Sequence, residues 1–211
     1  MRAERKKIVK VEVHHNDLPN DLKLGSTIAI DTETMGLDPH RDRICLAQLS
    51  CGEGVVHLVR FSQDGINAPN LASVLSNSEI LKIFHFGRFD LAVLRQYIGV
   101  MAQSVYCTKI ASKLARTYTD RHGLKDLCRE LLGIDISKEQ QSSDWGAAQL
   151  TDKQIEYAAG DVVHLHVLKQ KLDEILIREG RHELAQACFD YLPYRAELDL
   201  AGWAQVDLFA H

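Results

Sequence analysis

The chain has 211 residues, of which 45% are apolar and 26% charged, and its formal net charge is −4. This composition is typical of a globular protein with a sizeable core, and no apolar run reaches the length of a bilayer span. The five cysteines are odd in number and lack Cys-x-x-Cys spacing. We therefore expect neither a disulfide framework nor a zinc site among them, and a cytoplasmic location.

The N-terminal segment begins with seven mostly charged residues and lacks the apolar core of a signal peptide, so we expect no secretion signal. Within residues 1–20, apolar alternation predicts an edge strand that includes Ile8, Val9, Val11 and Val13. The two histidines that follow, His14 and His15, are expected on a solvated surface rather than as metal ligands.

The middle of the chain alternates short apolar runs with turn residues and helical periodicity. Strands are predicted at 27–31, 43–50, 55–60, 81–86 and 105–108, with a hairpin at 51–54. Helices are predicted at about 67–75, after Gly87, at 109–117 and at 122–132. Residues 134–148 are predicted to form a polar loop.

The C-terminal part of the chain is predicted to be helical. Thr151 and Gln154 have the spacing of a capping box, which opens a long helix predicted to end near residue 179. Gly160 inside it costs about 1 kcal/mol relative to alanine, so we expect a strand or a substrate to approach closely there. A last helix is predicted at 181–190, interrupted by Pro193.

These elements predict an α/β fold with a mixed five-stranded sheet flanked by helices. We find no repeat, low-complexity segment or linker, so a single domain over residues 1–211 is expected. Trp203, Leu208 and Phe209 make the tail after about residue 193 apolar. Such a tail should pack on its own domain or on another subunit.

Two acids at the end of the first predicted central strand are the main chemical signal. Asp31 and Glu33 are one residue apart, so in a strand their carboxylates point to the same side. Like charges held this close repel unless a cation lies between them, and Mg²⁺ or Mn²⁺ prefers such oxygen ligands. The alternative is an ordinary acidic turn after a strand.

Two further acids occur in contexts that could point to the same place. Asp90 falls in the first turn of a predicted helix, where a carboxylate is also favoured by the helix dipole. Tyr157 and Asp161 are four residues apart and so project from one helix face. Taken alone, Tyr157 would be an ordinary half-buried helix residue.

In order and spacing, Asp31/Glu33, Phe89-Asp90 and Tyr157/Asp161 resemble the three motifs of the DEDD 3′→5′ exonucleases, tyrosine subclass. Within that group the chain is similar to the ribonuclease D branch and to its short oligoribonucleases of the nano-RNase C (NrnC) type. The resemblance covers nearly the whole chain and includes the segments 38–43, 117–124 and 137–145. It implies a ribonuclease H-like arrangement of the sheet. Larger ribonuclease D proteins carry extra C-terminal helical domains, for which we expect no room here.

The resemblance also implies a reaction, hydrolysis of a 3′-terminal phosphodiester with release of nucleoside 5′-monophosphates. Two divalent cations, Mg²⁺ or Mn²⁺, are the implied cofactors. By the motif match, Asp31 bridges the two ions and Asp90 helps to hold the leaving-group ion. Glu33 and Asp161 serve the ion on the nucleophile side. Tyr157 would orient the attacking water, because a phenol with a pKa of about 10 is protonated at neutral pH.

Substrate contacts are expected around these motifs. Leu37 follows the metal strand where related enzymes place an apolar wedge between two terminal bases, and the alternative is a core residue. Candidate phosphate binders are His85, Arg88, Arg121, His122, Lys138 and Gln141. Trp145 could stack on a base, cover the site or belong to the core.

Three functions remain open. The first is an oligoribonuclease that cleaves very short RNA, dinucleotides above all, and by resemblance forms a homo-oligomer, an octamer. The second is a general ribonuclease D-like exonuclease on longer RNA or DNA, and the third is a non-catalytic nucleic-acid-binding protein. The four motif acids account for the whole net charge of −4. The absence of a basic excess favours the first, because long polyanions are bound through many Lys and Arg contacts.

Overall fold

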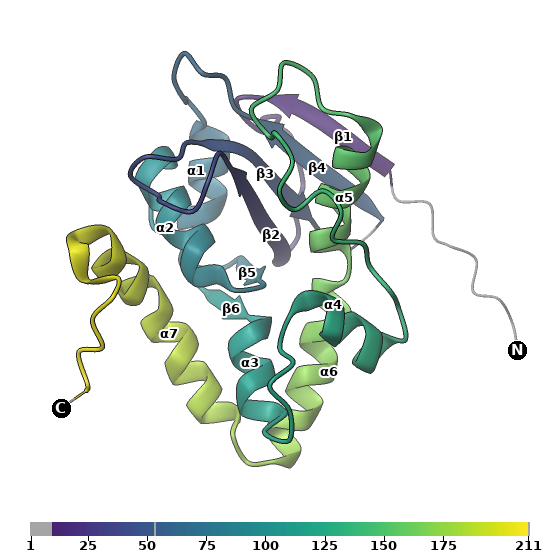
Figure 1. Cartoon of the computed structure of the whole chain (residues 1–211), viewed down its shortest axis with the longest axis vertical. Helices are drawn as coiled ribbons and strands as arrows, with labels where there is room; N and C mark the ends of the chain where they lie inside the picture. Colours follow the sequence, from purple (N-terminus) through teal and green to yellow (C-terminus); the bar gives the residue numbers. More distant parts are fainter. Residues whose placement is uncertain (1–9, 53, 211) are drawn as a thin grey trace, which may run out of the picture.

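The computed structural model describes residues 10–52 and 54–210, which form helices around one mixed sheet (Figure 1). The strands are β1 Lys10–His15, β2 Thr27–Thr34, β3 Ile44–Ser50, β4 Val55–Arg60, β5 Leu81–Phe84 and β6 Val105–Cys107. They lie in the order β1-β4-β3-β2-β5-β6. Strand β3 pairs antiparallel with β2 and with β4. The other pairs are parallel: β1 with β4, β5 with β2, and β6 with β5. The predicted α/β class is confirmed, and the sixth strand of the described sheet is the edge strand β1.

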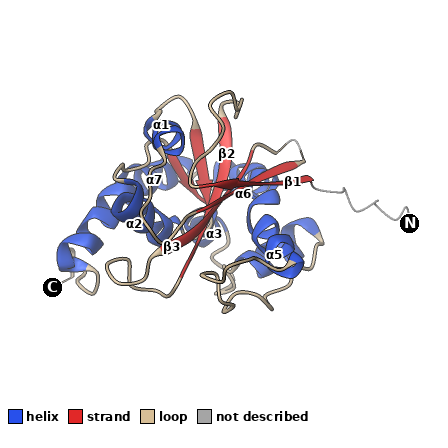
Figure 2. Ribbon diagram, turned by 90° about the horizontal axis from the view of Figure 1, so that it is seen from above, coloured by secondary structure: helices blue, strands red, loops and turns tan. Residues whose placement is uncertain are grey.

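The helices are α1 Pro69–Ser76, α2 Gly87–Ile98, α3 Thr108–Ala115, α4 Leu124–Leu127, α5 Asp152–Val163, α6 Leu165–Arg178 and α7 His182–Leu198. Two π-helical turns extend α4 and α7, namely η1 Cys128–Leu132 and η2 Asp199–Trp203. Figure 2 shows α1, α2 and α7 on one side of the sheet and α5 and α6 on the other. Within the described residues, no helix has the length and apolar character that crossing a bilayer requires. Of the residues predicted in the edge strand, Ile8 and Val9 lie outside the described residues.

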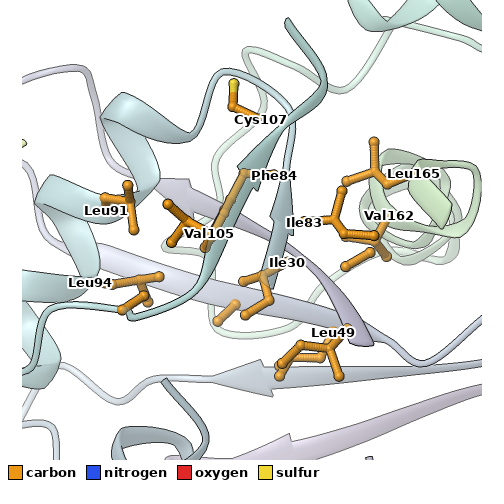
Figure 3. Close-up of a cluster of buried hydrophobic side chains, with 14 of the residues drawn as sticks. Ile30, Leu49, Ile83, Phe84, Leu91, Leu94, Val105, Cys107, Val162 and Leu165 are labelled. Atoms are coloured by element: carbon orange, nitrogen blue, oxygen red, sulfur yellow. The ribbon is translucent and has the colours of Figure 1, made fainter. Parts of the chain in front are cut away.

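The core fills both faces of the central strands (Figure 3). Strand β3 is buried along its whole length, because it has a strand on each side and a helix layer over each face. On one face Phe84 packs near Leu91 of α2, and on the other Ile83 packs near Val162 of α5. Each such side chain contributes about 1.5–3 kcal/mol through burial. This packing fixes β2, the strand that carries the first two motif acids.

The long helix predicted from Thr151 is two helices. The capping box between Thr151 and Gln154 is confirmed, but the helix breaks at His164, whose backbone has φ −96° and ψ −11°. Helix α5 packs on β2, β3 and β4, whereas α6 packs mainly on α3. The break lets each half follow its own neighbour.

The prediction that Pro193 ends the last helix is wrong. Helix α7 continues to Leu198 with Pro193 inside it. A proline removes one backbone hydrogen bond, but the two halves share a buried stripe that includes Phe189 and Ala196. Packing of that stripe against α2, α3 and β6 holds the helix together across the proline.

Two glycines differ in what surrounds them. A Cβ on Gly87, at the start of α2, would lie 2.7 Å from the Cβ of Phe84. A Cβ on Gly160 would meet no atom within 4 Å outside its own helix backbone. The expected approach of a strand to Gly160 is therefore wrong, and the approach of a substrate remains the open alternative.

We predict that Gly87→Ala lowers the free energy of unfolding by about 1–3 kcal/mol, because the start of α2 must shift away from Phe84. Gly160→Ala should raise it by up to about 1 kcal/mol through helix propensity. Denaturant unfolding in the presence of a chelator measures both changes. A destabilised Gly160→Ala variant, or an unchanged Gly87→Ala variant, would contradict this packing.

Candidate active site

Strand β2 and helix α5 bring three acids together. Asp31 and Glu33 point to the face of the sheet that α5 covers, and Asp161 comes from α5 itself. One carboxylate oxygen from each lies within 4.8 Å of the other two. The strand period of two puts Asp31 and Glu33 on one side of β2, and the helix that starts at the Thr151 cap brings Asp161 to the same place.

Asp90 reaches the same place from the opposite face. It lies in the first turn of α2, is 4% exposed and accepts a 2.6 Å hydrogen bond from the Thr32 hydroxyl. Its negative charge raises the pKa of Asp31, Glu33 and Asp161. The structure therefore brings the four predicted acids into one cluster, with Asp90 set back from the other three.

The cluster is electrostatically strained without a cation. Burial raises the pKa of Glu33 to about 9, and the charges of Asp161 and Asp90 add to this shift. Burial also raises the pKa of Asp90 and of Asp161 to about 7. The pKa of Asp31 lies well above its usual range because of burial and then its acidic neighbours. An all-carboxylate set of this kind fits hard divalent cations such as Mg²⁺ or Mn²⁺.

Tyr157 stands beside Asp161 as the helix spacing predicts. Its hydroxyl hydrogen-bonds the Asp161 carboxylate, and its ring lies 6.0 Å from that of Trp145. Burial, followed by the charge of Asp161, raises the pKa of the phenol. Tyr157 therefore keeps its proton at neutral pH and donates it to Asp161, which leaves its oxygen to accept a hydrogen bond from a water.

Gln48 is a member of the site that sequence reasoning missed. It pairs with Asp31 across β2 and β3, and its Nε2 lies 3.4 Å from Asp31 Oδ2 and 3.5 Å from Glu33 Oε1. It is fully buried. A neutral amide here holds the two carboxylates in place without supplying a charge. The strand register is the signal that identifies it.

Lys138 lies near both His85 and Asp161. His85 shares a 2.9 Å hydrogen bond with Thr108 Oγ1, and burial lowers the pKa of His85 to about 3, so its ring is neutral at pH 7. The charge of Lys138 lowers the pKa of both His85 and Asp161. The loop of residues 134–148 therefore carries a cation to the edge of the cluster.

Leu37 projects from a braced loop just after β2. It is 85% exposed, so the alternative of a core residue is wrong. Asp42 accepts a 3.0 Å hydrogen bond from the Asp38 amide and two from the Arg41 guanidinium. A Cβ on Gly36 would lie 2.2 Å from Asp42 Oδ2, so this tight loop requires glycine there. The loop holds an apolar side chain out into solvent next to the metal strand.

Two predicted substrate contacts are already engaged within the protein. Arg88 donates to both carboxylate oxygens of Asp199 at 2.5 and 2.7 Å and to the Ala204 carbonyl at 2.8 Å. Its guanidinium is bound to residues 199–204, so the expected phosphate contact stays a prediction. Trp145 is 3% exposed and packs against Tyr157, so its side chain is not available for base stacking.

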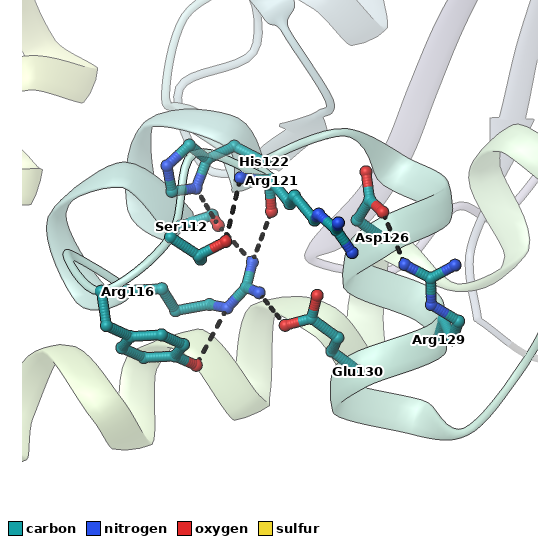
Figure 4. Close-up of polar contacts among 9 residues, drawn as sticks. Ser112, Arg116, Arg121, His122, Asp126, Arg129 and Glu130 are labelled. Carbon is teal, nitrogen blue, oxygen red and sulfur yellow. Dashed lines mark hydrogen bonds and ion pairs between the residues drawn. The ribbon is translucent and has the colours of Figure 1, made fainter.

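Arg121 and His122 belong to a separate polar network between α3 and η1 (Figure 4). Arg116, fully buried, donates to Ser112 Oγ and to the Arg121 carbonyl, each at 3.0 Å, and pairs with Glu130. His122 Nδ1 hydrogen-bonds the same Ser112 hydroxyl at 2.9 Å. This network fixes the turn that carries Arg121 and leaves that residue exposed. Gln141 is also exposed, in a turn that its amide closes on the Lys138 carbonyl.

Sequence reasoning also missed Phe86 and Lys109 at the edge of the site. Phe86 follows β5, has φ +64° and is 48% exposed. Lys109 Nζ lies 4.1 Å from its ring centroid, and the charge of Lys109 also lowers the pKa of His85. A left-handed backbone on a bulky residue is strained and is common at functional sites. Nothing in the local sequence indicates it.

Comparison with known proteins gives consistent relatives. A profile of 3′-5′ exonucleases matches residues 7–177. Ribonuclease D of Gluconacetobacter diazotrophicus is 36% identical over 73% of this chain and 39% of its own length. The corresponding protein of Acidiphilium cryptum is 30% identical over 86% of this chain and 46% of its length. The chain thus spans less than half of these curated relatives.

Solved structures cover the chain more completely. Brucella melitensis NrnC bound to pGG is 55% identical with a TM-score of 0.93, covering 96% of this chain and 99% of that one. The same protein with bound Mg²⁺ is 54% identical with a TM-score of 0.92, covering 96% and 100%. Escherichia coli RNase D is 27% identical with a TM-score of 0.71, covering 86% and 50%.

We predict that the metal-free protein loses stability as pH rises from about 4, where unfolded carboxyls ionise, to about 9. Unfolded carboxyls titrate at a pKa of about 4, but Asp90, Asp161 and Glu33 keep protons up to about pH 7–9 when folded. The folded state therefore binds more protons than the unfolded state in this window, so the free energy of unfolding falls with rising pH and levels off once the folded carboxyls have ionised. Melting temperatures with chelator, compared with Mg²⁺, measure the effect.

Asp31→Asn should flatten this pH dependence and remove the stabilisation by Mg²⁺. Asp64→Asn, at an exposed loop position, is the matched control and should behave as wild type. A melting temperature in chelator that stays constant or rises over the window would contradict the charge cluster.

Proposed function

The chain belongs to the 3′-5′ exonuclease family, and from that premise we propose that it hydrolyses short RNA, dinucleotides above all, to nucleoside 5′-monophosphates in the cytoplasm. The observation that carries this proposal is the convergence of Asp31, Glu33, Asp90 and Asp161 beside Tyr157. Mg²⁺ or Mn²⁺ would be the cofactor. The Mg²⁺ in the structure of Brucella melitensis NrnC supports this choice.

Each side chain has a distinct task in this reaction. A pair of divalent cations bound here would activate water and stabilise the leaving 3′-oxygen. In this proposal Asp31, which lies near all three other acids, would help to hold both ions, and Glu33 and Asp161 would hold the one on the nucleophile side. Asp90, set back and held by Thr32, serves the other side. Tyr157 keeps its proton in the hydrogen bond to Asp161, so its oxygen can accept a hydrogen bond from the attacking water and so orient it.

The substrate is held by few groups in this proposal. Leu37 is exposed beside the metal strand, where it can separate two bases by stacking. Lys138 and Lys109 supply positive charge near the neutral His85, where a phosphate of the substrate can lie. Phe86 offers a second apolar surface at the same edge. The pGG bound to Brucella melitensis NrnC, a short RNA, supports this substrate class.

The C-terminal segment supports an oligomer, and we propose a closed homo-oligomer, an octamer. Trp203, Leu208 and Phe209 are 47%, 44% and 78% exposed in a single chain. Large apolar side chains gathered near one end of the chain favour burial against another subunit. A closed assembly would restrict access to the site and so favour short RNA.

One feature favours the alternative of longer RNA or DNA. A hollow of about 300 Å³ opens on the same face of the sheet and is lined in part by Arg43, Arg60 and Ser62. Arg60 lies in register with Glu33 through Leu46 of β3, about 10 Å away at the usual strand spacing. Arg60 at that distance, with Arg43 in the same hollow, could hold phosphates beyond a dinucleotide. A non-catalytic binding protein is not favoured, since the four acids and Tyr157 are retained together.

The direct test is a time course on 5′-labelled RNAs of two, three, five and seven nucleotides, with Mg²⁺, Mn²⁺ or chelator. We expect the dinucleotide to be cleaved far faster than the others, and chelator to stop the reaction. Similar stepwise shortening of all lengths would favour the general exonuclease. Separate alanine variants of Asp31, Glu33, Asp90 and Asp161 should fold and lose hydrolysis, and wild-type rates in any of them would remove that acid from the site.

We predict that Leu37→Ala raises KM for a dinucleotide about five- to tenfold, because a stacking contact contributes about 1 kcal/mol or more. The melting temperature should not change, since Leu37 is 85% exposed. Ile177→Ala removes another exposed apolar side chain, on α6, and serves as the control. Equal KM values for the two variants would contradict the proposal that Leu37 lies between two bases of the substrate.

A further inference from the structure

A second cluster of possible metal ligands lies at the β1 edge of the sheet, away from the catalytic acids on β2. Edge strand β1 lies beside β4 (Figure 1). The two strands pair in parallel, so Glu12 faces His57 in register, and His14 follows two residues later. The three side chains therefore share one face of the sheet. His57 is in register with Leu49 and, through it, with Ile30, whereas Asp31 is one residue further along. The cluster thus lies on the face opposite to Asp31.

The ligand atoms of this cluster converge on one point. His14 Nε2 lies 3.0 Å from His57 Nδ1, and Glu12 Oε2 lies 3.5 Å from the same nitrogen. All three ligand atoms lie within 4.8 Å of one another. With metal–ligand bonds of about 2.0–2.2 Å, two ligands of a tetrahedral ion are about 3.3–3.6 Å apart. The two separations at His57 Nδ1, 3.0 and 3.5 Å, are close to these ligand–ligand distances.

We propose that Glu12, His14 and His57 form a second metal site, which takes a borderline divalent cation of the Zn²⁺ type. Imidazole ligands favour zinc and its transition-metal neighbours, whereas Mg²⁺ prefers the all-oxygen set of the catalytic cluster. Two histidines and one glutamate leave the fourth tetrahedral position for water. The expectation that His14 lies on a solvated surface without a metal role is revised here, because His57 enters only through strand pairing.

The surroundings define how open the site is. His57 is 5% exposed, so its ring is fixed by the sheet, while Glu12 and His14 keep partial contact with solvent. The His14 and His57 rings are stacked with centroids 5.3 Å apart. Lys10 Nζ contacts Glu12 Oε1 at 2.5 Å, which leaves Oε2 turned toward His57. The Lys10 side chain is 70% exposed and can move away when a cation binds.

A bound ion would join the edge strand to the sheet. Glu12 and His14 come from β1 and His57 from β4, so one ion would add a cross-link between two strands that already pair through their backbones. An ion that binds the folded chain more tightly than the unfolded chain raises the melting temperature. The site therefore has a readout that does not involve catalysis.

The test is a Co²⁺ titration of the metal-free full chain, followed by visible absorption and compared with the change in melting temperature on adding Zn²⁺. Tetrahedral Co²⁺ absorbs strongly, while an octahedral all-oxygen site absorbs weakly. We expect one strongly absorbing Co²⁺ per chain, retained in Asp31→Asn, which disables the catalytic cluster. We expect it to be lost in His14→Ala and in Glu12→Gln, along with the stabilisation by Zn²⁺.

The matched control is His15→Ala. His15 follows His14 in β1, so its side chain points to the other face of the sheet, and this variant should titrate as wild type. Both His14→Ala and Glu12→Gln change partly exposed side chains, and circular dichroism verifies that they fold. If wild type gives no strong band, or if His14→Ala keeps it, the contact between His14 and His57 is an ordinary hydrogen bond and the proposal is overturned.

Discussion

The repulsion among four clustered carboxylates, three half-buried and one buried, is the constraint on which the rest of the structure depends. Burial raises the pKa of each acid, and neighbouring carboxylates raise those of Asp31, Glu33 and Asp161 further, with Glu33 at about 9, so the cluster needs a cation to stay ionised at neutral pH. Only a rigid scaffold can hold such groups together. Strand β2 provides it, because it has β3 on one side, β5 on the other and a helix over each face.

The two helices that complete the cluster are held by contacts outside it. Helix α5 starts at the Thr151 cap, and helix α2 is tied to the C-terminal segment. Arg88, two residues before Asp90, holds Asp199, and Arg95 further along α2 holds Glu197. The position of Asp90 therefore depends on how α7 and the residues after it pack. If the exposed apolar tail is buried by another subunit, assembly and the geometry of the site are coupled through these ion pairs.

Local spacing was enough to predict much of this site. The i, i+2 relation of Asp31 and Glu33 and the i, i+4 relation of Tyr157 and Asp161 follow from strand and helix periods alone. Residues that reach the site through pairing of distant segments were missed, and Gln48, which lies opposite Asp31, is the example. The same limit explains Arg88, because its partner Asp199 is more than a hundred residues away. The break at His164 was missed too, because packing on β2–β4 and on α3 decides where each half of the helix goes.

The most direct measurement of the central claim is anomalous diffraction from a crystal grown or soaked with Mn²⁺. The account predicts two peaks roughly 3.5–4 Å apart among Asp31, Glu33, Asp90 and Asp161. Both peaks should be lost in Asp31→Asn. A fully ordered cluster of the four acids that holds no Mn²⁺ at a saturating concentration would contradict the account.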